Sequence, residues 1–98
     1  MRYTRRAEAD LDGIGAYTLD RWGIEQCIRY LDALERACER LAQDPKLGRV
    51  HLPRPRYSRF EQGKHVLFFR RQADEVVIVR ILHERMLPEL HLTGEADE

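Results

Sequence analysis

The sequence has few of the residues on which catalysis and extracellular stability often depend. Its 98 residues include two cysteines, one serine and two lysines, and its formal net charge is zero. Zero net charge argues against a protein that simply coats nucleic acid or an anionic membrane. No apolar run approaches the ~20 residues of a membrane helix, and the first residues lack the apolar stretch of a secretory signal. We therefore expect a cytoplasmic protein that binds no membrane.

The cysteines and histidines carry no pattern of a disulfide or a metal site. Cys27 and Cys38 lie on one predicted helix, about 16 Å apart along its axis, which is too far for a disulfide. His83-Glu84 begins like a zinc-protease motif, but Leu87 stands where the second histidine is required. We expect no metal and no cofactor, because metal-ligand spacing is missing around all four histidines: His51, His65, His83 and His91.

Catalytic motifs are also missing. There is no phosphate-binding glycine motif and no nucleophile elbow, and Ser58 is the only serine. We therefore assign no catalytic residue. A nuclease without metal stays open, because RNA can supply its own 2′-hydroxyl while basic side chains act as acid, base and phosphate clamp. The side chains available for that chemistry are Arg59, Lys64, His65, Arg80, His83 and Arg85.

Residues 7–43 have the apolar spacing of two helices. Leu11, Ile14 and Trp22 recur at helical steps over residues 7–22, and Gly23 can end that helix. A stronger stripe runs over residues 24–43 and stops before Pro45. Because almost nothing joins the two segments, the pattern predicts an antiparallel helical hairpin.

The period then changes from helical to extended. We expect a short strand over residues 2–5, an antiparallel meander over residues 57–62, 65–71 and 75–83, and a polar tail over residues 84–98. The fold class is α+β, with the hairpin packed on a small twisted, mostly antiparallel sheet. The whole chain, residues 1–98, forms one domain in this interpretation.

The last strand is apolar on both faces. Strict alternation points Val77, Val79 and Ile81 to one side, and the intervening apolar residues to the other. The hairpin should cover one face, and an uncovered apolar face would be larger than a monomer usually exposes. Either the tail folds over the second face or a partner protein covers it, and the sequence leaves both open.

The zero net charge hides an uneven distribution. Residues 44–71 hold eight basic side chains against two acidic ones, which gives this segment a charge of +6. Such a segment suits an acidic protein or phosphates. Arg80 is unusual because it emerges from an apolar strand, and such an arginine is usually paired or functional.

Taken in order, these segments resemble the ParE branch of the RelE/ParE toxin superfamily of bacterial toxin–antitoxin systems. The match runs from about residue 3 to residue 92, and its most specific part is the end of the last strand. The matching motifs are Ala9-Asp10-Leu11-x-x-Ile14-x-x-Tyr17, Trp22-Gly23, Leu41-Ala42-x-x-Pro45-x-x-Gly48, His65-Val66-Leu67-Phe68-Phe69-Arg70 and Val79-Arg80-Ile81-Leu82-His83-x-Arg85-Met86.

The resemblance implies a toxin that inhibits DNA gyrase, is not itself an enzyme, and is neutralised by a ParD-like antitoxin. It implies no sequence-specific DNA binding by this chain alone. The alternatives are a RelE-like ribosome-dependent mRNA endonuclease and a non-toxic interaction module.

Two sets of contact residues complete the interpretation. We expect contacts with the target at Arg59, Arg80, His83, Arg85 and Met86. We expect contacts with the antitoxin at Trp22, Leu31, Leu34, Arg56, Val66 and Phe68. An alternative for Arg80 is an ion pair that closes the tail.

Overall fold

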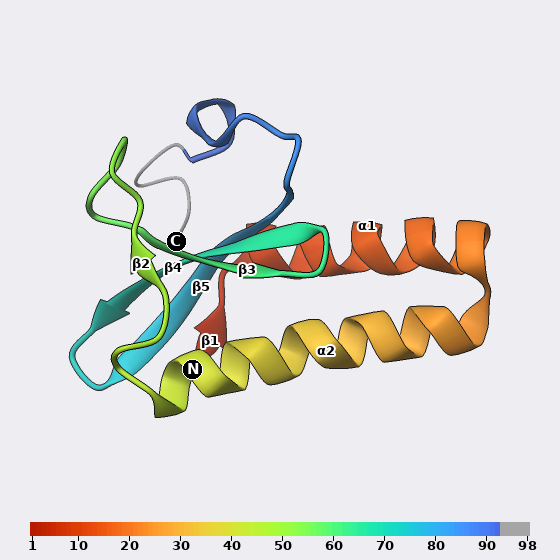
Figure 1. Ribbon diagram of the computed structural model, residues 1–98, viewed down its shortest axis with the longest axis horizontal. Helices are drawn as coiled ribbons and strands as arrows, with labels where there is room; N and C mark the ends of the chain where they lie inside the picture. Colours follow the sequence, from red (N-terminus) through yellow and green to blue (C-terminus); the bar gives the residue numbers. More distant parts are fainter. Residues whose placement is uncertain (93–98) are drawn as a thin grey trace.

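The computed structural model describes residues 1–92 as a helical hairpin packed against one face of a five-stranded sheet (Figure 1). The α+β class expected from the sequence is confirmed. The predicted tail beyond Leu92 lies outside the described residues. The elements are β1 (Arg2–Tyr3), α1 (Arg5–Trp22), α2 (Ile24–Gln43), β2 (Arg49–Val50), β3 (Ser58–Gln62), β4 (His65–Gln72), β5 (Glu75–His83) and a 3-10 helix, η1 (Pro88–Leu90).

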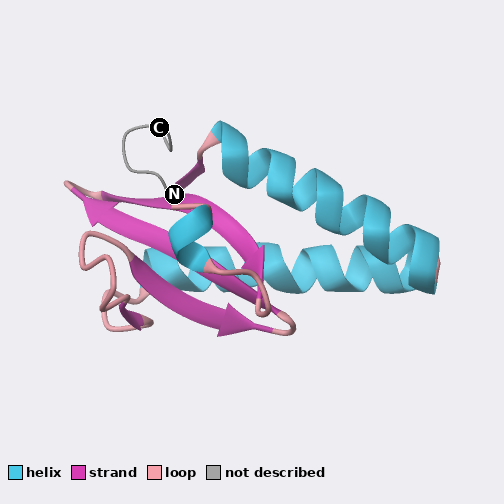
Figure 2. Ribbon diagram, turned by 90° about the horizontal axis from the view of Figure 1, so that it is seen from above, coloured by secondary structure: helices cyan, strands magenta, loops and turns pink. Residues whose placement is uncertain are grey.

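The hairpin begins two residues earlier than the apolar spacing indicates. Thr4 caps α1, because its hydroxyl accepts the Ala7 N–H at 3.1 Å, so the helix starts at Arg5. Gly23 separates the helices with a φ of 86°, in the left-handed region that favours glycine. Both cysteines lie buried in α2 and are not bonded to each other. The far half of the hairpin extends beyond the sheet (Figure 2).

The sheet has the order β1-β5-β4-β3-β2. The β3–β4–β5 meander is antiparallel, as the sequence predicts, while β1 pairs in parallel with β5 and sets Arg2 beside Val77. The two-residue β2, which has no clear sequence signal, adds a short antiparallel edge to β3.

A β-bulge in β5 overturns the predicted alternation. Phe68 pairs with Arg80 but Phe69 pairs with Ile78, so Val79 is an extra residue in β5. Beyond the bulge the faces are exchanged, and Ile81 points towards the helices rather than sharing a face with Val79. The expectation that Val77, Val79 and Ile81 share one face is therefore wrong for Ile81.

The second sheet face is closed by the chain itself. Figure 1 shows η1 and the segment around it on the side of the sheet away from α2. Leu92 and Tyr57 are fully buried there against Val66 and Phe68. Of the two coverings that the sequence left open, folding back of the tail accounts for this cluster. The expectation that Val66 and Phe68 lie open for a partner is wrong.

Candidate functional site

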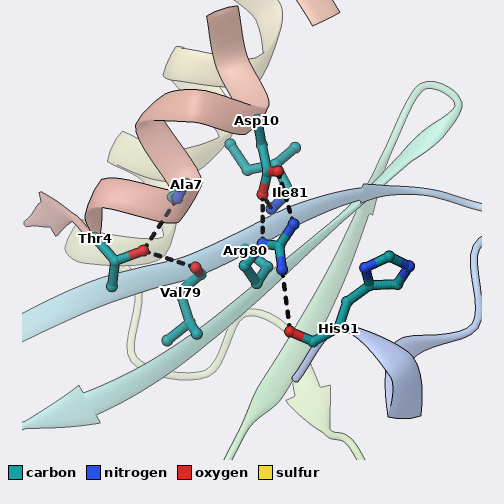
Figure 3. A network of polar contacts seen from close by, with 7 residues as sticks. All are labelled: Thr4, Ala7, Asp10, Val79, Arg80, Ile81 and His91. Carbon is teal, nitrogen blue, oxygen red and sulfur yellow. Dashed lines mark hydrogen bonds and ion pairs between the residues drawn. The ribbon is translucent and has the colours of Figure 1, made fainter. Parts of the chain in front are cut away.

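The exposed edge of β5 is attached to α1 by side chains. Because β1 ends at Tyr3, no other described strand lies beside the second half of β5 on that side. The Thr4 hydroxyl donates to the Val79 carbonyl at 2.7 Å, and a carboxylate oxygen of Asp10 accepts the Ile81 N–H at 2.8 Å (Figure 3). These bonds satisfy strand-edge groups that would otherwise need a neighbouring strand.

The same carboxylate holds Arg80. The Arg80 Nε and Nη2 atoms donate to the two Asp10 oxygens at 2.8 and 2.9 Å, and Nη1 donates to the His91 carbonyl at 3.0 Å. The side chains of Arg80 and Asp10 are 13% and 14% exposed. Arg80 therefore joins α1, β5 and the tail: its ion pair is with Asp10 of α1, and its contact with the tail is the hydrogen bond to the His91 carbonyl. The contact with a target that we also expected of Arg80 would have to break this network.

A groove of about 800 Å³ opens between the hairpin and the end of β5. One wall comes from α1 and from the first turns of α2, and the other comes from the β3–β4 turn and from the residues that end and follow β5. The lining residues include Asp10, Gly13, Ile14, Tyr17, Trp22, Tyr30, Lys64, His65, Ile81, His83, Arg85 and Met86. Apolar and aromatic walls with a few polar groups are typical of a binding site.

Two histidines and a tyrosine form the polar end of this groove. The Tyr30 hydroxyl accepts the Lys64 N–H at 3.0 Å and lies 2.5 Å from His65 Nδ1. His83 Nδ1 accepts the Arg85 N–H at 3.1 Å, so the neutral His83 ring carries its proton on Nε2. The two imidazole rings meet edge to face, with their centroids 5.4 Å apart.

Burial tunes the ionisable groups at this end. Burial is the main reason why the pKa of His65 lies below its usual value, and the neighbouring His83 lowers that pKa further. The carboxylates of Asp10 and Glu84 act in the opposite direction and raise it. Burial also raises the pKa of Tyr30, so its hydroxyl stays protonated at neutral pH. The groove therefore holds neutral hydrogen-bonding groups beside the exposed cations of Lys64 and Arg85.

The structure brings together three of the five predicted target contacts. His83, Arg85 and Met86 line the groove. Arg59 lies on the sheet face away from the helices, where its guanidinium stacks over Phe68 and pairs with Glu61 at 3.2 Å. Burial opposes ionisation of Glu61, but Arg49 and Arg59 outweigh it and lower the pKa of that carboxyl.

The predicted antitoxin contacts are dispersed. Trp22 is 70% exposed and lines the groove, Leu31 is half-buried, and Arg56 is exposed with its guanidinium over the Tyr57 ring. Leu34 is fully buried in the core beneath the hairpin. The expectation that Leu34 lies open to a partner is wrong, because the apolar stripe of α2 faces the sheet there.

Sequence reasoning missed Asp10, Tyr17 and Tyr30 as parts of this site. Nothing local marks the role of Asp10, because its partner Arg80 lies 70 residues away in the sequence. The tyrosines carried one available signal, because a tyrosine beside an apolar helix stripe needs a partner for its hydroxyl.

Comparison with known proteins identifies the family. The family model for the ParE toxin of the type II toxin–antitoxin system parDE matches residues 1–88. The chain belongs to the ParE toxin family. The toxin ParE1 of Caulobacter vibrioides is 40% identical over 92 residues, which cover 93% of this chain and 95% of the relative. The toxin ParE1 of Mycobacterium tuberculosis is 40% identical over 82 residues, covering 82% of this chain and 84% of the relative.

A solved structure agrees with this assignment. The chain superposes on a chromosomal ParDE toxin–antitoxin system from P. aeruginosa with a TM-score of 0.70 and 25% identity, covering 84% of this chain and 91% of the other. The predicted ParE resemblance is thus confirmed, and the chain is a ParE-type toxin of a type II toxin–antitoxin system. That family is not a class of enzymes.

Two features are absent from residues 1–92 of this ParE chain. No described helix is long and apolar enough to span a membrane. Within the same residues, no three His, Cys, Asp or Glu side chains are grouped so that they could hold a metal ion.

Proposed function

We propose that this ParE chain acts in the bacterial cytoplasm by inhibiting DNA gyrase, and that a ParD-like antitoxin neutralises it. The observation that carries the proposal is the match to the parDE toxin model over residues 1–88. The solved relative named as a ParDE system supports an antitoxin as the partner.

Residues at the groove are suited to contact the target. Arg85 and Met86 are exposed at the groove, immediately after the strand that Asp10 and Arg80 hold in place. A guanidinium beside a methionine combines a charge-assisted contact with adaptable apolar contact. We assign target contact first to Arg85, Met86 and His83. Arg59 is a separate contact on the opposite sheet face.

Neutralisation would follow from covering the same groove. Trp22 stands at the groove with most of its surface exposed, which is unusual for an isolated tryptophan and common at interfaces. An antitoxin segment seated against Trp22 would also cover Arg85 and Met86. Leu31 and Arg56 are secondary contacts in this proposal.

Gyrase assays with purified chain test the target. The wild type should inhibit supercoiling and trap cleaved DNA on gyrase, and an Arg85→Ala, Met86→Ala double variant should lose at least tenfold in potency. The matched control is Arg36→Ala with Leu52→Ala, which removes an exposed cation and an exposed apolar side chain outside the groove lining. Equal potency of the two double variants would contradict the assigned contacts.

Expression without antitoxin separates the function classes. Growth arrest with gyrase-linked DNA breaks supports the proposal. Cleaved ribosome-bound mRNA would replace it with the RelE-like endonuclease, for which Lys64, His65, His83 and Arg85 are grouped around the groove while Arg59 is not. Arg80→Ala is a poor test of target contact, because its loss disturbs the fold.

A further inference from the structure

We propose that the polar end of the groove is a carboxylate-binding site, built from His65, His83, Lys64 and Arg85, that takes an acidic residue of a peptide segment of the protein partner. The inference rests on the proposed function in one respect only, which is that the partner is an antitoxin. The residues that line the groove indicate the chemistry of the ligand.

Two imidazole rings supply the hydrogen-bond donors at this end of the groove. Since His83 Nδ1 accepts the Arg85 N–H, the neutral ring must use Nε2–H as its donor. The Tyr30 hydroxyl already accepts the Lys64 N–H and is free to donate its own hydrogen to His65 Nδ1. In the tautomer in which Tyr30 donates, the His65 ring also carries its hydrogen on Nε2. Two imidazole N–H donors therefore lie in one small region of the groove lining.

The charges around the two imidazoles leave a net cation for a ligand. Six ionisable or charged groups face the two imidazoles from the surrounding elements: Asp10 from α1, Tyr30 from α2, Lys64 from the β3–β4 turn, Glu84 and Arg85 after β5, and Arg80 behind Asp10. Asp10 is held by Arg80, and Glu84 lies 3.8 Å from Lys64. No ion pair of the Arg85 side chain is found within residues 1–92, so a positive charge remains for an anion.

The apolar part of the groove restricts which anion fits. Tyr17, Trp22 and Ile14 line the same groove, so the ligand should carry an apolar or aromatic body beside its charge. A nucleic acid also carries aromatic bases, but its successive phosphates would meet the carboxylates of Asp10 and Glu84, which also line the groove. An acidic residue next to an aromatic or aliphatic residue in a peptide satisfies both ends of the groove.

Protonation of His65 strengthens the site. A protonated ring places a second hydrogen on Nδ1, and the Tyr30 hydroxyl can accept it because oxygen has two lone pairs. A bound carboxylate raises the pKa of His65, so binding takes up protons and weakens as the pH rises through that raised pKa. The pH dependence of binding is therefore assigned to His65.

The test uses 3-phenylpropionate and its uncharged amide as probes of the labelled full-length chain, followed by NMR. The acid should shift the imidazole resonances of His65 and His83 and bind at least threefold more tightly than the amide. Its affinity should rise two- to fivefold between pH 8 and pH 6. In a His65→Gln, His83→Gln double variant the preference for the acid over the amide should fall at least twofold, because Arg85 keeps its charge but both imidazole donors are lost, while a His91→Gln control keeps the full preference.

Each contrary result would overturn the site. Equal binding of acid and amide by the wild type removes the carboxylate preference, and the wild-type resonances decide this even if the double variant fails to fold. Tighter binding of inorganic phosphate than of 3-phenylpropionate would reject the peptide ligand. The gyrase assay on His65→Gln is read separately, so a failure of the proposed target and a failure of this site give different results.

Discussion

Removal of the Arg80 side chain should reduce the free energy of unfolding by about 3 kcal/mol. Breaking a buried ion pair by deleting one partner costs roughly 3–5 kcal/mol, because the remaining charge stays uncompensated. Asp10 and Arg80 are 14% and 13% exposed, which places this pair at the lower end of that range. Arg80→Ala also loses the hydrogen bond to His91. For a chain of this size, the melting temperature should fall by roughly 12–24 °C.

Urea unfolding followed by circular dichroism measures this effect, and the chain offers a matched control. Arg36 and Asp32 form an ion pair of similar length, 2.9 Å, but their side chains are 75% and 54% exposed. Arg36→Ala should change stability by less than about 0.5 kcal/mol. A double-mutant cycle of Arg80→Ala with Asp10→Ala should give a coupling energy of about 2 kcal/mol. A loss below about 1 kcal/mol for Arg80→Ala would refute the reasoning.

Further predictions concern packing, backbone and pH. Leu92→Ala should cost about 2–3 kcal/mol in urea unfolding, because Leu92 is fully buried over the second sheet face; a neutral result would mean that the tail does not cover it. Gly48→Ala should destabilise by more than about 1 kcal/mol, since its φ is 87° and a Cβ would stand 2.7 Å from the Phe69 ring. Gly13→Ala should raise the melting temperature, because it lies inside α1 with open space around it; a fall would contradict this. Thermal stability should decrease as the pH falls below about 6.5, because burial lowers the pKa of His51 and His65 and the unfolded chain binds protons first. His51→Gln should flatten this pH profile, and an unchanged slope would contradict the assignment.

Periodic features were the predictable part of this fold. The helical stripe of α2 and the β-branched run of β5 give the hairpin and the meander, because burial of a face imposes a period on the sequence. The requirement that Arg80 be paired or functional also followed from the sequence, since a cation on an apolar strand needs a partner. That Asp10 is this partner could not be predicted, because contacts between residues 70 positions apart leave no local pattern in the sequence.

Features that break a period were the unpredictable part. The extra residue Val79 moves Ile81 to the other face, and no residue near it signals a bulge. Closure of the second face depends on Leu92, and nothing local distinguishes it from the other large apolar residues of that segment, Met86, Leu87 and Leu90. The groove could not be predicted from the sequence either, because Tyr30 and His65 come into contact only after the hairpin has packed on the sheet.

The parallel pairing of β1 with β5 has a consequence for how the toxin is made. Arg2 and Tyr3 pair with Val77 and Ile78, and Asp10 contacts Arg80. The first elements to leave the ribosome therefore cannot form these contacts until the last strand has been synthesised. Contacts this distant in sequence slow folding, because the chain must close a long loop before they form. A polypeptide that stops before β5 keeps the sequence of both helices but lacks the strand that α1 packs against. Because the end of β5 and the residues after it form one wall of the groove, interrupted synthesis should yield no assembled groove.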